Sequence, residues 1–371
     1  MPYRIEHINM RSYGDKPDWF LKKNPSGMLP VVEIDGQMMS DSIRIMQVLD
    51  SLDDTVPMLP RGDKGALGRA NELMQMEREL FSAWCSFVFQ PGGFGQKSFE
   101  KTLDRVDKAL LQTDGPWFLG GDTPSIVDLQ YVTHVERMAP SALYWKGFTV
   151  RGGPGGAAET RWPGLHRWLA AFEDRQTYVA TKSDYYTHIM DIPPQYGPGQ
   201  GVAEAEALAK LLDGREGWQL PLPALSADAP EPVLDKPLVR IADGDARIEA
   251  ALCLIGNHKN IARFCARAAG SEVGQWRQQG GGSKSALADP YAKPKDEVVP
   301  DLDACLRHVA HALLAGPEVA AQQVVKPEVD SRVQQECLGY LRQRISVPRD
   351  MSYPAARQLR AHLSWGMDQI K

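Results

Sequence analysis

Two short groups of residues among the first fifty have types and a spacing that could bind a peptide. Pro30 stands at the start of the apolar run 31–34, where a strand tolerates a missing N–H group. If the bond before it is cis, the backbone N–H and C=O of Leu29 would face outward and could pair with a peptide laid alongside as an extra strand. Further on, Asp41 and Ser42 precede a helical pattern, where free N–H groups and the helix dipole favour a carboxylate. Together these residues predict a small site for a peptide with an anionic end.

Holding these residues in place requires strands, a tight turn and helices. The segment 2–8 carries Tyr3, Ile5 and Ile8 among polar residues and predicts a strand, and a short helix is expected near 16–23. The dipeptide Asp35-Gly36 after the run 31–34 is typical of a two-residue β-hairpin turn. A helix is expected from Ser42 to Leu52. The first 57 residues therefore predict a small α/β unit.

A second motif lies far along the chain, in a region of helical periodicity from about 63 to 185. Ser125 and Asp128 have the spacing of a capping box, in which each side chain bonds the backbone N–H of the other residue. For stability, a well-capped helix start explains this motif completely. The second region is predicted to be all-α.

The two motifs occur in the same order in the glutathione transferase superfamily, which this sequence resembles over roughly residues 1–190. The residues that carry the resemblance are Asn24, Pro25, Gly27, Pro30, the run 31–34, Asp35, Gly36, Asp41 and Ser42, followed by the capping box and the Trp-rich pattern at 162–178. The resemblance implies an α/β thioredoxin-like domain followed by an all-α transferase-type domain. It also implies glutathione as a substrate, with the Leu29 backbone beside Pro30 pairing with the cysteinyl part, and Asp41 and Ser42 holding the γ-glutamyl end. Members are commonly dimeric, so a homodimer is expected.

The chain divides into three predicted domains. Residues 1–57 form an incomplete, truncated thioredoxin-like glutathione-binding domain, and residues 63–190 form the transferase-type helical domain. Residues 200–371 form a further helical domain of unknown role, with helical patterns at 246–270, 300–316, 327–345 and 354–369. Stretches rich in Pro and Gly, at 192–201 and 219–237, are expected to separate the domains, and 278–297 is expected to be a loop.

The reactive residue of the superfamily, a Tyr, Ser or Cys, follows the first strand, and this chain reads as if it begins at the second strand. No reactive residue can therefore be assigned: Ser40 and Ser42 belong to the binding turn, and Cys85 in an apolar helix is expected to be an inert thiol. Two hypotheses follow. The protein transfers or exchanges the thiol of glutathione with an electrophile or a disulfide, or it is a noncatalytic scaffold that binds another protein.

Composition limits the other classes of function. The 371 residues carry a net charge of −5 and five widely spaced cysteines without a CxxC pair, so no metal site or disulfide framework is expected. No nucleic-acid partner, membrane partner or membrane span is expected. The predicted location is cytoplasmic, or organellar if an upstream targeting segment is missing.

Several residues allow both a functional and a structural interpretation, and in most the structural one is favoured. A packed helix face is preferred to a metal site for Cys305, His308 and His311, and His258 is expected to interrupt a helix or lie on the surface. The tract 151–156 is expected to be a loop rather than an RNA-binding or phosphate-binding segment. Lys22 and Lys23 could bind the glycyl carboxylate or simply end a helix. One aromatic cluster is expected to be mostly core, with one wall of a pocket for an apolar co-substrate as the alternative. It consists of Phe81, Trp84, Phe87 and Phe89.

Overall fold

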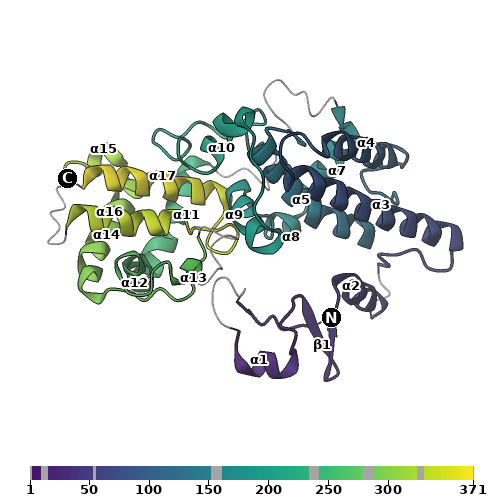
Figure 1. Cartoon of the computed structure of the whole chain (residues 1–371), viewed down its shortest axis with the longest axis horizontal. Coiled ribbons are helices and arrows are strands. Elements are labelled where there is room, and N and C mark those ends of the chain that lie inside the picture. The colour runs from purple at the N-terminus through teal and green to yellow at the C-terminus, as the bar shows by residue number, and fades with distance from the viewer. Residues whose placement is uncertain are drawn as a thin grey trace.

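The computed structural model describes residues 2–9, 16–52, 56–151, 161–233, 242–278, 287–323 and 330–370. A small N-terminal lobe, drawn in purple in Figure 1, lies below two groups of helices. The first group runs from α3 to α10, and the second, in green and yellow, runs from α11 to α17. The predicted order of a small α/β unit, a helical domain and a further helical region is confirmed.

The N-terminal lobe consists of α1 (Asp18–Lys23), the strands β1 (Val31–Ile34) and β2 (Gln37–Ser40), and α2 (Ser42–Ser51). The strands form an antiparallel hairpin whose register pairs Val31 with Ser40 and Ile34 with Gln37. Asp35 and Gly36 have φ values of 49° and 78°, as a type I′ turn requires at its two central residues. The predicted hairpin and both predicted helices are present.

The strand predicted for residues 2–8 is not formed. In the described part of the N-terminal lobe, β1 and β2 are the whole sheet, and residues 2–9 have no regular secondary structure. The side chains of Tyr3 and Ile5 are 81% and 66% exposed, so this segment buries neither an apolar face nor a backbone edge. Alternation predicts a strand only where a neighbouring strand and a packed face stabilise it.

The first helical domain has its capping box where the sequence predicts it. Its helices are α3 (Lys64–Val88), α4 (Gln96–Leu111), α5 (Ile126–Lys146), α7 (Pro163–Glu173), α8 (Gln176–Val179), α9 (Tyr185–Tyr196), the 3₁₀ turn η1 (Ala203–Ala205) and α10 (Glu206–Leu212). At the start of α5, the Asp128 N–H donates to the Ser125 hydroxyl at 3.4 Å, and the Ser125 N–H donates to the Asp128 carboxylate at 2.8 Å.

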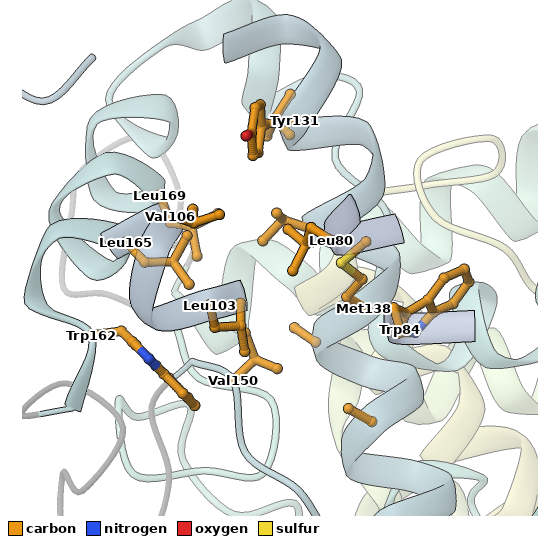
Figure 2. Packing of buried hydrophobic residues seen from close by; sticks show 14 of the residues in the cluster. Leu80, Trp84, Leu103, Val106, Tyr131, Met138, Val150, Trp162, Leu165 and Leu169 are labelled. Atoms are coloured by element: carbon orange, nitrogen blue, oxygen red, sulfur yellow. The ribbon is translucent and has the colours of Figure 1, made fainter. Parts of the chain in front are cut away.

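The core of this domain is formed by the facing sides of α3, α4, α5 and α7. Figure 2 shows Leu80 and Trp84 of α3 close to Met138 of α5, and Leu103 and Val106 of α4 facing α7. The core continues beyond α9 to Leu212 and Trp218. Helix α9 also runs through Pro193 and Pro194 before Gly197, so the predicted break at 192–201 begins later than expected.

The C-terminal domain has its own core of buried aliphatic side chains and cysteines. Its elements are α11 (Asp243–Gly256), α12 (His258–Cys265), η2 (Ala266–Ala269), α13 (Gln275–Gln278), η3 (Asp296–Val298), α14 (Val299–Ala315), α15 (Pro317–Ala320), α16 (Ser331–Arg342) and α17 (Tyr353–Gln369). The single helix predicted for 246–270 is two helices, because Asn257 has φ −126° and ψ 22° and ends the first one. No helix in the described part of the chain is long and apolar enough to cross a bilayer.

The start of α9 joins the two helical domains. The Tyr186 hydroxyl donates to the carbonyl of Gln343 at 2.7 Å, and the Val347 N–H donates to the Thr187 hydroxyl at 3.2 Å. The Arg360 guanidinium of α17 pairs with the buried Asp184 carboxylate, which caps α9, at 2.5 Å. Side-chain contacts therefore fix the C-terminal domain against the first helical domain.

Candidate functional site

A hydrogen-bonded turn precedes Pro30. The Asn24 side-chain amide donates to the carbonyl of Met28 at 2.8 Å, and the Ser26 hydroxyl donates to the Asn24 side-chain oxygen at 2.7 Å. Gly27 has φ 63°, a conformation that glycine adopts readily. The Leu29–Pro30 peptide bond that follows is cis, and Leu29 is 42% exposed. Within the described chain, no backbone hydrogen bond is formed by the N–H or C=O of Leu29.

The hairpin register brings the two groups of predicted site residues to the same end of the sheet. The last ladder pair is Val31 with Ser40, so the next residues outward are Pro30 and Asp41, and then Leu29 and Ser42. Directly opposed residues in an antiparallel pair have Cα atoms roughly 4.5–5.5 Å apart, and the chains begin to diverge beyond the ladder. The exposed Leu29 backbone and the start of α2 therefore border one small region.

Asp41 adopts an uncommon conformation at the start of α2. Its φ is 82°, and one carboxylate oxygen accepts the Arg44 N–H at 2.9 Å as the helix cap. A non-glycine residue in the left-handed region costs about 1–3 kcal/mol and occurs preferentially at functional sites. Asp41 is exposed and directly precedes the first N–H groups of the helix. The arrangement offers an acceptor for an ammonium group next to donors for a carboxylate.

The lysines at the end of α1 differ in their contacts. Lys23 forms an ion pair with Glu33 of β1 at 2.7 Å, and both side chains are about half exposed. This pair ties α1 to the hairpin, so binding of the glycyl carboxylate by Lys23 would require the pair to open. Lys22 is exposed.

All five cysteines carry thiols whose ionisation is disfavoured. Burial raises the pKa of the Cys85, Cys305 and Cys337 thiols to about 11, and burial also raises the pKa of Cys253 and Cys265. The thiolate, and not the thiol, is the nucleophile. The cysteines of this chain are therefore protonated near neutral pH.

The predicted aromatic cluster has two parts. Trp84 and Phe87 are each 1% exposed and belong to the core. Phe81 and Phe89 are half-buried and lie next to Tyr196 of α9, with ring centroids 5.7 and 6.2 Å apart. Phe81 and Phe89 thus form, with Tyr196, an aromatic surface at the edge of the core.

The remaining candidates have structural contacts. The Cys305 thiol donates to the Gln334 side chain at 3.5 Å, and His308 stacks on Trp365, with a pKa lowered by burial and by His311. Among the described residues, no group of three or more His, Cys, Asp or Glu side chains could hold a metal ion. His258 is the first residue of α12, directly after the break at Asn257.

Of the tract 151–156, Arg151 alone is described, and residues 152–156 lie outside the described residues. Arg151 forms a buried, two-contact ion pair with Glu173, whose pKa falls to about 2 despite its burial because Arg151 and Lys182 bond it. Arg151 therefore belongs to the core of the first helical domain.

Three residues that contribute to the sites were not predicted. Ser26 orders the turn before Pro30, and the Asn-x-Ser spacing at 24–26, typical of side-chain-bonded turns, could have indicated it. The arginines Arg267 and Arg344 line a cavity in the C-terminal domain, and no sequence motif marks them.

Comparison with known proteins gives matches to both transferase-type domains. Residues 1–52 match the family described as "Glutathione S-transferase, N-terminal domain", and residues 73–171 match "Glutathione S-transferase, C-terminal domain". The hairpin with its cis-Pro and capped helix, followed by the helical domain with its capping box, has the order of these two domains. Residues 1–171 thus carry the N- and C-terminal domains of the glutathione transferase superfamily, and further helices follow beyond them.

The relatives are distant. Protein IN2-1 homolog A from Oryza sativa subsp. japonica is 27% identical over 172 residues, which cover 46% of this chain and 66% of that protein. Probable glutathione S-transferase DHAR2, chloroplastic, from the same organism is 26% identical over 152 residues, which cover 40% of this chain and 51% of that protein. The crystal structure of glutathione transferase Omega 3C from Trametes versicolor has 22% identity and a TM-score of 0.40, covering 48% of this chain and 76% of that one. The chain thus spans between half and two thirds of the length of these two curated relatives.

Proposed function

We propose that this protein binds glutathione at the end of the hairpin and transfers or exchanges its thiol with an electrophile or a disulfide. The observation that supports this proposal is the hairpin register, which ends at Val31 with Ser40, so that Pro30 and Asp41 are the next residues outward on the two chains. The exposed Leu29 backbone would pair with the cysteinyl residue of the tripeptide as a short strand. The γ-glutamyl ammonium would bind the Asp41 carboxylate, and the γ-glutamyl carboxylate would bind Ser42 and the N–H groups of α2. Residues 1–57 would be the glutathione-binding domain.

In this proposal the nucleophile is the thiol of glutathione itself, because burial keeps all five cysteines of the chain protonated. The chain would hold the tripeptide and an apolar acceptor in contact, so that reaction becomes effectively unimolecular. The aromatic surface of Phe81, Phe89 and Tyr196 is our candidate for the acceptor wall. The residue that activates the thiol is unassigned. We also propose a homodimer, because members of the superfamily are commonly dimeric.

The test is calorimetric titration of glutathione into the chain and into Asp41→Asn. Asparagine caps helices as well as aspartate does, so α2 should remain formed while the carboxylate is lost. Loss of one charge-assisted bond should weaken glutathione binding roughly 10- to 100-fold. Asp63→Asn, at the cap of α3, is the matched control and should bind like the wild type. Absence of binding by the wild type, or equal affinity in Asp41→Asn, contradicts the proposed site.

The second candidate function is a noncatalytic scaffold, which is motivated by the further helices α11–α17 and by the lack of an assigned reactive residue. The same preparation, assayed with glutathione and either an aromatic halide or a low-molecular-weight disulfide, distinguishes the two functions. Glutathione binding without turnover in either assay would support the scaffold. Turnover that falls in Asp41→Asn would support the transferase.

A further inference from the structure

A cavity of about 660 Å³ lies between α9 and the C-terminal helices. Its walls come from α9 of the first helical domain, from α11, α12 and α16, and from the segment 343–351. In Figure 1, α9 lies on the side of the first group of helices that faces the second group. None of the lining residues belongs to the described segment 16–52 that carries the proposed glutathione site. Asn9 of the N-terminal lobe also lines the cavity, but none of the proposed glutathione-binding residues does. The cavity volume is that of a site for a drug-sized molecule.

The cavity contains two guanidinium groups that are bound only by carbonyl oxygens. Arg344 donates to the carbonyls of Leu287 at 3.2 Å and Tyr340 at 3.1 Å, and its guanidinium lies on the Tyr340 ring, 3.4 Å from the centroid. Arg267 donates to the carbonyls of Ala292, at 2.9 Å, and Asp289. Within the described chain, neither arginine forms an ion pair at contact distance. Among the described residues, one terminal nitrogen of each guanidinium has no hydrogen-bond partner.

Two of the carboxylates around the cavity have contacts other than an ion pair with these two arginines. The Asp350 carboxylate is bound by Arg349, at 2.8 Å, and the Asp289 carboxylate accepts the Gly274 N–H at 3.2 Å. Asp191 of α9 is the third carboxylate in the wall. Desolvation lowers the pKa of Arg344, and Tyr340 and Asp289 act in the opposite direction. A half-buried guanidinium of this kind pairs best with a carboxylate that can accept two parallel bonds.

One part of the cavity wall is apolar, although polar side chains such as Asn257, Asn260 and Gln343 also line it. The apolar part includes Met190 of α9, Leu254 of α11, Ile261 and Phe264 of α12, and Met351. Such a wall favours an aliphatic or aromatic body by the removal of apolar surface from water. Cys253 also lines the cavity, but burial, Glu249 and Asp350 raise its pKa, so its thiol is not set up for covalent attachment.

We propose that this cavity binds a carboxylate carried on a rigid apolar or aromatic body, with the carboxylate on Arg344 and Arg267 and the body against α11 and α12. The carboxylate would bind the two guanidinium groups noncovalently, through hydrogen bonds and opposite charge. Since the wall includes residues of both helical domains, the bound molecule would also strengthen their association, because a ligand stabilises the state that binds it.

The test uses the full chain and two fluorescent probes of the same shape, 1-pyrenebutyrate and the uncharged 1-pyrenebutanol. The acid should bind with one-to-one stoichiometry and about tenfold or more tighter than the alcohol, as expected for a charge-assisted bond. Arg344→Gln should lower the affinity for the acid about tenfold or more and leave the affinity for the alcohol unchanged. Arg307→Gln removes an exposed arginine of α14 and should change neither.

Ile261→Trp, which fills the cavity from α12, should weaken the binding of both probes. This variant replaces Arg344→Gln as the test if Arg344→Gln does not fold. Glutathione and inorganic phosphate at millimolar concentration should not displace the acid. Equal affinities for the acid and the alcohol would overturn the proposal. Unchanged binding of the acid in Ile261→Trp would also overturn it. Displacement of the acid by glutathione would overturn it too, because the probe would then occupy the hairpin site.

Discussion

Asp128 shows how many contacts one buried carboxylate can satisfy. Its side chain accepts hydrogen bonds from the N–H groups of Ser125 and Phe118, at 2.8 and 3.0 Å, and from the Trp168 indole at 2.9 Å. It therefore holds the start of α5, the preceding turn and α7 together. The capping box was readable from the spacing in the sequence. The hydrogen bonds to Phe118 and Trp168 could not be predicted from the sequence, because they depend on how α7 folds back onto α5.

We expect Asp128→Ala to lower the free energy of unfolding by about 3 kcal/mol or more. Loss of a cap costs about 1 kcal/mol, and each buried donor left without a partner costs about 1–3 kcal/mol. Urea unfolding monitored by circular dichroism measures the change. Asp63→Ala removes the exposed cap of α3 and should cost about 1 kcal/mol alone. Equal losses in the two variants would show that the extra contacts of Asp128 contribute nothing.

Among the helices, the packing of α7 on α4 depends on a residue without a side chain. A Cβ atom at Gly164 would lie 2.8 Å from the carbonyl oxygen of Asp107 and 3.0 Å from Cγ of Leu111. The oxygen is part of the α4 backbone and cannot rotate away. Gly164→Ala should therefore separate the two helices and destabilise the protein by about 1–3 kcal/mol.

Gly68, in α3, is the matched control for this substitution, because a Cβ there would meet nothing within 4 Å. Gly68→Ala should stabilise the protein by about 0.5–1 kcal/mol through the higher helix propensity of alanine. Thermal unfolding of the two variants should give midpoints on opposite sides of the wild type. A Gly164→Ala variant at least as stable as the wild type would contradict the close approach of α7 to α4.

Secondary structure was predictable where the signal is local. The turn at Asp35-Gly36 needs only two residues with positive φ, and the cap at Ser125 needs only four residues of sequence. The strand at 2–8 failed because a strand depends on a neighbour that the sequence pattern cannot supply. The division at Asn257 was missed because helical periodicity continues on both sides of the break.

At the scale of the whole molecule, the junction of the two helical domains holds an acid in its protonated form. Desolvation and the nearby Asp184 carboxylate raise the pKa of Glu231 to about 8 from an ordinary value of 4.5, and Lys182 offsets this only partly. The Glu231 side chain also accepts the Tyr185 N–H at 3.1 Å. The folded protein therefore keeps a proton that the unfolded chain releases. The stabilisation is complete below about pH 4.5, declines above it, and is lost once the pH has passed about 8.

Glu231→Gln, which is neutral at every pH, should remove this dependence. Relative to the variant, the wild type should lose up to about 1.4 kcal/mol of stability per pH unit between pH 5 and 8. Urea unfolding at pH 5, 6.5, 8 and 9 measures the difference, in which titrations common to both proteins cancel. Glu318→Gln, an exposed site on α15, should follow the wild type. Parallel curves for the wild type and Glu231→Gln would exclude a protonated Glu231.

The contacts of Asp184, Tyr186 and Thr187 with the C-terminal helices join residues that are 157 to 176 positions apart. Side chains at one end of α9 thus attach the last helices directly to the first helical domain, although α10–α16 lie between them in the sequence. Each helical domain carries one half of this contact surface. The C-terminal helices can accordingly be compared with a second subunit that is covalently linked to the first, so that the two always meet within one molecule.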